Sequence, residues 1–125
     1  KLKELQEYTA REKGTFFLGF HFEKTYRLIF PSQMLIISSM KSFQDEMSDD
    51  RARSIHGRTI WAQQFKTPYE QFIGFLIQTG FVVYDQQSNK LMLTPLGKTF
   101  LEYLQNNNIP LKLPANDLIG IPSAQ

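Results

Sequence analysis

A run of acidic residues is the first feature of this sequence that has the chemistry for a site. Asp45, Glu46, Asp49 and Asp50 lie close together in the chain. Carboxylates bind divalent metal ions, but catalytic two-metal sites need carboxylates that converge from separate elements. A single local run supplies only proximity in sequence. We therefore expect no metal site here.

Other catalytic chemistry is equally hard to assemble from these residues. His21 and His56 have no partner at a ligand or catalytic spacing, so we expect packed or surface histidines. The chain has no cysteine, and no glycine-rich phosphate loop or serine nucleophile stands in a recognisable setting. We expect no cofactor, and no enzyme activity from this segment alone.

The basic residues point to a different kind of site. Arg51, Arg53, Arg58 and Lys66 form the densest basic cluster of the chain and would suit contacts to a nucleic-acid backbone. The alternative is a solvated face, in which the acidic run that precedes them neutralises part of their charge. The formal net charge is only +2, from 14 basic and 12 acidic residues, and it does not decide between the two.

A hairpin and a closing helix are the clearest elements that could position these residues. Gly80 can take the left-handed conformation that ends a helix. Residues 81–84 and 91–94 are rich in β-branched, aromatic and aliphatic side chains and predict two strands, joined by the polar stretch 85–90. Thr94-Pro95 predicts a helix start. The apolar stripe of that helix consists of Leu96, Phe100, Leu101 and Leu104.

Three further helices are predicted before the hairpin. Pro31 begins a pattern of helical apolar spacing that runs to Met47, and residues 59–65 suit a short second helix. Thr67 is expected to cap a third helix that runs to Thr79, with Pro68 at its first position. Together these helices would form a tri-helical core.

The stretch from helix to hairpin to "LTPLG" resembles the second half of winged-helix DNA-binding domains, as in MarR-like and PadR-like repressors. In those families the recognition helix ends in a glycine, a wing hairpin follows, and "LT-x-x-G" opens the next helix. The matching positions are Leu76, Gly80, Phe81, Val82, Leu93, Thr94 and Gly97. The resemblance covers residues 67–104 and implies a mainly α protein with a small β-hairpin (α+β), a winged helix.

The resemblance also implies double-stranded DNA as the partner. The recognition helix would present Lys66, Thr67, Tyr69 and Gln71 at its start. Gln71 would read adenine, and Thr67 or Tyr69 would hold a phosphate. The hairpin tip, whose alternative is a solvated loop, would lie along the minor groove or the backbone. Its residues are Gln86, Gln87, Ser88, Asn89 and Lys90.

One feature of the third helix favours a second interpretation. Its apolar residues cover nearly the whole circumference, which is typical of a buried helix, and Glu70 would lie near phosphates that it repels. These apolar residues are Phe72, Ile73, Phe75, Leu76 and Ile77. One consequence would be burial of this helix under other elements, such as residues 1–30. The alternative function is a winged-helix module in which this helix, the phenylalanine-rich segment or the N-terminal helix binds a partner protein or a second copy of the chain.

The ends of the chain complete the expected organisation. Residues 1–30 form an N-terminal extension, with an amphipathic helix at residues 1–13 and a phenylalanine-rich segment of mixed or irregular structure. Residues 31–105 form the winged-helix core, and the proline- and asparagine-rich residues 106–125 suit an extended connector.

The chain begins with a lysine, and we expect a piece of a longer protein. The parent would be a repressor, a replication factor or a restriction-type nuclease. No signal peptide or membrane span is predicted, so we expect no membrane partner and a cytoplasmic, nucleoid or nuclear location.

Overall fold

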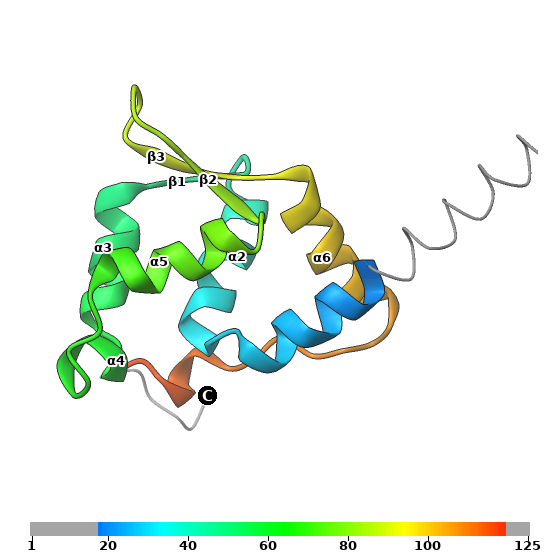
Figure 1. Ribbon diagram of the computed structural model, residues 1–125, viewed down its shortest axis with the longest axis horizontal. Helices are drawn as coiled ribbons and strands as arrows, with labels where there is room; N and C mark the ends of the chain where they lie inside the picture. Colours follow the sequence, from blue (N-terminus) through cyan, green and yellow to red (C-terminus); the bar gives the residue numbers. More distant parts are fainter. Residues whose placement is uncertain (1–17, 120–125) are drawn as a thin grey trace, which may run out of the picture.

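The computed structural model describes residues 18–119, which form a mainly helical structure with one small sheet, as the α+β expectation requires (Figure 1). Its elements in chain order are a helical segment at residues 18–28, α2 (Pro31–Ser42), β1 (Glu46–Ser48), α3 (Asp49–Gly57), α4 (Ile60–Gln63), α5 (Tyr69–Gln78), β2 (Val82–Asp85), β3 (Lys90–Leu93), α6 (Pro95–Asn106) and the 3-10 turn η1 (Pro114–Asn116).

The sheet is antiparallel, and its strand order is β1-β3-β2. Met47 lies opposite Leu91, and Val82 lies opposite Leu93. These four side chains are buried, whereas Val83 is half exposed on the other face. Side chains alternate between the faces of a strand, so one face of the sheet closes the core. A two-stranded hairpin is marginally stable alone, and β1 supplies the third strand that it needs.

The core surrounds α2, which lies behind α5 in the view of Figure 1. Ile36, Ile37 and Met40 of α2 are fully buried. Phe81 and Phe100 stack beside them with ring centroids 4.6 Å apart. Aromatic rings bury the largest areas of any side chains, so this stack ties the start of the hairpin to α6.

The predicted first helix is too long at its end. Helix α2 stops at Ser42, and Met47, expected on the same helix, lies in β1. Gln44 and Asp45 both have φ 62°, a left-handed conformation that interrupts the helix. Phe43 and Met47 continue the helical apolar spacing, so periodicity alone missed this boundary. Pairing of β1 with β3 is a tertiary contact that spacing does not report.

The second helix of the core also differs from the prediction. The expected helix at residues 59–65 is reduced to the single turn α4, whose N-cap Thr59 accepts a hydrogen bond from the Ala62 amide. The longer helix α3 lies before it, in the charged stretch that begins at Asp49. Ser48 caps α3 by accepting from the Arg51 amide. A serine N-cap followed by acidic residues is a strong start signal, because both satisfy the free amides of the first turn.

The junctions around the hairpin are confirmed. Gly80 has φ 84°, its amide donates to Ile77 O, and the Phe81 amide donates to Leu76 O. This pair of bonds is the Schellman motif that ends a helix at a left-handed residue. Thr94 caps α6 by accepting from the Gly97 amide, with Pro95 at the first helical position.

The phenylalanine-rich segment is helical in the part that the structure describes, residues 18–28. Phe22 is buried against Phe81 and Phe100, so the segment belongs to the same core. The amphipathic helix expected at residues 1–13 lies outside the described residues.

The C-terminal segment is not the extended connector that its composition predicts, at least as far as residue 119. It returns along the domain (Figure 1), and Asp117 is buried between α2 and α4. Asp117 Oδ2 accepts from the Ser32 amide at 3.1 Å, from Ser32 Oγ at 2.7 Å and from Trp61 Nε1 at 2.9 Å. These buried bonds fix residues 107–119 to the core. Residues 120–125 lie outside the described part.

Candidate nucleic-acid interface

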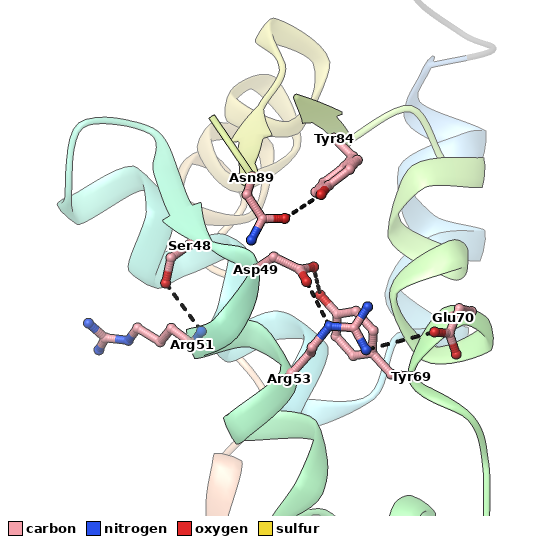
Figure 2. Close-up of polar contacts among 8 residues, drawn as sticks. All are labelled: Ser48, Asp49, Arg51, Arg53, Tyr69, Glu70, Tyr84 and Asn89. Carbon is pink, nitrogen blue, oxygen red and sulfur yellow. Dashed lines mark hydrogen bonds and ion pairs between the residues drawn. The ribbon is translucent and has the colours of Figure 1, made fainter. Parts of the chain in front are cut away.

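Three elements expected to face DNA meet at one place, shown in Figure 2. The amide of Asp49, at the start of α3, donates to the main-chain oxygen of Asn89 in the hairpin at 3.1 Å. Asn89 in turn accepts a side-chain hydrogen bond from the Tyr84 hydroxyl. The Tyr69 hydroxyl, at the start of α5, donates to Asp49 Oδ1 at 2.7 Å. Asp49 therefore joins α3, α5 and the hairpin.

Arg53 completes this network from the next turn of α3. Its Nε donates to Asp49 Oδ2 at 2.6 Å, and its guanidinium lies 4.2 Å from the centre of the Tyr69 ring. Its Nη1 is 3.8 Å from Glu70 Oε1 (Figure 2). The Asp49 carboxylate and the Tyr69 ring hold the guanidinium in one position, so little side-chain freedom remains to be lost on binding.

The electrostatics of the network keep each group in its ordinary charge state. Burial raises the pKa of Asp49, but hydrogen bonds from Tyr69 and Arg53 outweigh it and hold that pKa below its usual value. Burial and the hydrogen bond to Asp49 raise the pKa of Tyr69 far above its usual value. The hydrogen bond to Asp49 raises the pKa of Arg53. At neutral pH the network is an anion, a neutral phenol and a cation.

The predicted basic residues divide into paired and exposed groups. Arg53 is paired with Asp49, as the solvated-face alternative anticipates, and Lys90 of the hairpin is paired with Glu46 at 3.0 Å. Arg51, Arg58 and Lys66 are exposed, and within residues 18–119 none of them forms an ion pair. These three side chains are therefore the exposed cations of the predicted basic cluster.

The start of α5 differs from the predicted cap. Pro68, rather than Thr67, is the N-cap, so no side chain caps this helix. The Thr67 carbonyl instead accepts from His56 Nε2 at 2.8 Å. Tyr69 is buried, with its hydroxyl on Asp49, and does not face an incoming phosphate.

The exposed side chains at the start of α5 are therefore fewer than expected. Lys66, Glu70 and Gln71 face solvent there. Of the residues assigned to this helix start from the sequence, Lys66 and Gln71 keep a position suited to DNA.

The outer side of α5 is partly covered and partly open. Phe75 is half-buried and shares a cavity with Leu28 of the N-terminal helical segment. This segment therefore lies beside one edge of α5, as expected if other elements cover the helix. On the other edge Ile77 is 42% exposed, beside a shallow cavity of about 280 Å³ that Tyr84 also lines. Val83 is 50% exposed on β2. Val83 faces the other side of the sheet, so the apolar surface next to the polar network consists of Ile77 and Tyr84.

The hairpin tip is smaller than the predicted stretch because Asp85 and Lys90 pair across the strands. The turn Gln86–Asn89 is exposed, and Asn89 has φ 54°. The Asp85 carboxylate accepts from the Gln87 amide and from Ser88 Oγ. These bonds give the turn a defined shape and leave the side chains of Gln86 and Gln87 available to a ligand.

Some important contacts were not visible in the sequence. Asp49 was expected only as a member of the acidic run, and Tyr84 only as a strand residue. The Tyr69–Asp49 hydrogen bond joins residues that lie on different helices. No motif or fixed spacing marks such a pair, although an aspartate directly after a serine cap was a signal for the start of α3.

The described residues hold no cluster of three or more histidine or carboxylate groups arranged to bind a metal. Both histidines contact main-chain oxygens, His21 that of Thr79 and His56 that of Thr67. In the same part of the chain, no helix has the length and apolar character needed to cross a membrane.

No protein family, curated protein or solved structure matches the chain.

Proposed function

We propose that this chain is a winged-helix domain that binds double-stranded DNA. Helices α2, α3 and α5 would be its tri-helical core, with α5 as the groove helix and β2–β3 as the wing. The order of these elements supports the proposal, as do the left-handed Gly80 and the threonine cap at Thr94, which occupy the positions of the winged-helix motif.

The observation that carries the proposal is the meeting of three elements around Asp49. It puts the exposed start of α5, the capped start of α3 and the hairpin on one connected surface (Figure 2). DNA-binding domains of this kind combine a helix start in the major groove with backbone contacts from flanking elements. Gln71 would read a base edge, and Gln86 and Gln87 would follow the backbone beside the wing.

The small number of exposed cations predicts weak DNA binding, in which contacts to phosphate supply most of the affinity. Arg51, Arg58 and Lys66 are the exposed cations of this region without a described ion pair. Each phosphate contact contributes about 0.9 to the slope of log affinity against log salt, so three contacts give a slope of about −2.7. This slope is well below that of proteins with about six to ten phosphate contacts.

Fluorescence anisotropy with a labelled random-sequence duplex tests the proposal directly. We expect binding that weakens as salt rises from about 50 to 200 mM. A triple variant, Arg51→Ala, Arg58→Ala and Lys66→Ala, should lose most of that dependence. Lys41→Ala is the matched control, because Lys41 is exposed on α2 and lines a different cavity, beside α6. Absence of binding at low salt would reject the proposal.

A second candidate function is docking of a protein partner or a second copy of the chain. The observation that favours it is the apolar surface of Ile77 and Tyr84, which are 42% and 41% exposed and line one cavity. Exposed apolar surface of this kind often marks an interface. A mass that rises with concentration in light scattering, and that Ile77→Gln abolishes, would support this function. A monomer at high concentration would exclude self-association.

A further inference from the structure

We propose that Arg53 and Glu70 together read one G·C base pair in the major groove. This inference rests on the proposed function, because it assigns a base preference to the same surface. The two side chains come from different helices, α3 and α5, and lie 3.8 Å apart at Nη1 and Oε1 (Figure 2).

Glu70 is the residue that a simple phosphate-binding surface does not explain. It lies in the first turn of α5, and its side chain is 75% exposed. A carboxylate at this position repels phosphates, so it suits DNA only where it can accept a hydrogen bond from a base. In the major groove the base that pairs with glutamate or aspartate is cytosine, through its N4 amino group.

Arg53 supplies the complementary donors. Its Nε is held by Asp49 and its guanidinium lies over the Tyr69 ring, yet its side chain remains 51% exposed. The Nη groups are therefore fixed in place while part of the side chain stays open to a ligand. Arginine donates to O6 and N7 of guanine, the most frequent specific contact in protein–DNA complexes.

The order of donors and acceptors selects the base pair. Across its major-groove edge a G·C pair presents two acceptors, N7 and O6, and then one donor, N4. Two N–H donors of Arg53 beside the carboxylate acceptor of Glu70 are complementary to this order. An A·T pair presents acceptor, donor, acceptor, so the second donor of Arg53 would face the adenine amino group. The Arg53–Glu70 pair therefore discriminates against A·T at this position.

The separation of the two groups permits this role. At 3.8 Å the Arg53–Glu70 contact is longer than a hydrogen bond, which for N–H···O has a donor–acceptor distance of about 2.7 to 3.2 Å. Neither group has to give up a hydrogen bond to the other in order to reach a base. The Asp49–Tyr69 bond keeps the two helix starts in register, so the pair is organised before DNA arrives.

Selection of duplexes from a pool with a randomised core tests the inference. The full chain should enrich G·C at one position of its site, by about tenfold over A·T for one well-formed base contact. Glu70→Gln should weaken that preference several-fold, because a neutral amide replaces the anionic acceptor for cytosine N4 while Arg53 still donates to guanine. Its affinity for random duplex should stay equal or rise, since a negative charge is removed. Glu102→Gln, the same change at an exposed position of α6, is the matched control and should keep the preference.

The outcomes separate this inference from the proposed function. Salt-dependent binding without a G·C preference, or with the same preference in Glu70→Gln, overturns base reading by the pair and leaves DNA binding intact. No binding of any duplex at low salt overturns both. Because Glu70 is exposed, its variants should fold; Glu70→Ala, with an unchanged melting curve, gives a second variant in which the preference must also fall.

Discussion

The close approach of α6 to the hairpin makes Gly97 a sharp test of the packing described above. A Cβ atom on Gly97 would lie 2.6 Å from the Phe81 carbonyl oxygen and 2.6 Å from a methyl group of Leu93. The Leu93 methyl can move, but the carbonyl is backbone and accepts the Thr94 amide at 2.9 Å. Gly97→Ala therefore requires a shift of the start of α6.

The magnitude follows from two opposing effects. Overpacking costs about 1–3 kcal/mol, and a clash with a fixed carbonyl belongs at the upper end. Alanine gains about 1 kcal/mol over glycine in a helix. We expect Gly97→Ala to lower the free energy of unfolding by about 2 kcal/mol.

Gly74 provides the matched control for this experiment. It lies within α5, and a Cβ there would meet nothing within 4 Å. Gly74→Ala should raise the free energy of unfolding by about 0.5–1 kcal/mol. Urea unfolding followed by circular dichroism measures both, and with a denaturant slope of about 1–3 kcal/mol per molar the Gly97→Ala midpoint should fall by roughly 1 M. A Gly97→Ala midpoint equal to that of the unchanged chain would refute the close approach.

Three further expectations concern single contacts. Gly80→Val should reduce stability by about 1–3 kcal/mol in thermal melts, because a β-branched residue disfavours φ 84°; an unchanged melting temperature would contradict the left-handed cap. Asp49→Asn should reduce stability by about 1–3 kcal/mol at neutral pH, since the pKa of Asp49 is lowered in the fold. That difference should be constant above about pH 5 and shrink as the pH falls below about 4; a pH-independent difference would argue against the ionised carboxylate. Asp117→Ala should lower the free energy of unfolding by about 2–4 kcal/mol, because it removes the acceptor of the Ser32 amide, the Ser32 hydroxyl and the Trp61 indole N–H. Urea unfolding measures this change, and an unchanged stability would show that residues 107–119 are dispensable.

The local junctions were predictable because their causes are local. A left-handed helix end at Gly80 follows from glycine's freedom at positive φ, and the helix start at Thr94-Pro95 follows from a side-chain cap and a fixed proline φ. Both strands of the hairpin also follow from residue type. These features need no knowledge of distant residues.

Other boundaries depended on distant partners. Met47 fits a helical stripe by spacing, but it pairs with Leu91 across the sheet. Thr67 has the sequence of a helix cap, yet its carbonyl binds His56 and Pro68 becomes the N-cap. Local propensity is weak compared with such contacts, so the sequence pattern placed these residues wrongly.

The same distinction between local causes and distant partners applies to the candidate site. The sequence identified the basic cluster, the polar hairpin tip and the exposed Gln71, because exposure of charged and polar residues follows from their chemistry. It did not show that Arg53 is held by Asp49, nor that Asp117 anchors the C-terminal segment. The Arg53–Asp49 pair lies within α3, one turn apart, whereas the bonds of Asp117 join residues on separate elements.

By itself, then, the sequence determined the helix-to-hairpin-to-helix signature and the residue types available to a ligand, because backbone preference and hydrophobicity act within a few residues. The tertiary structure alone decided the ion pairs between elements, such as Lys90 with Glu46 and Arg53 with Glu70. Arg53 and Arg51 are close in sequence, yet only Arg53 lies within reach of both Asp49 and Glu70. Asp49 precedes Arg53 by one turn of α3, so the helix itself forms that ion pair; the packing of α3 against α5 sets the distance to Glu70.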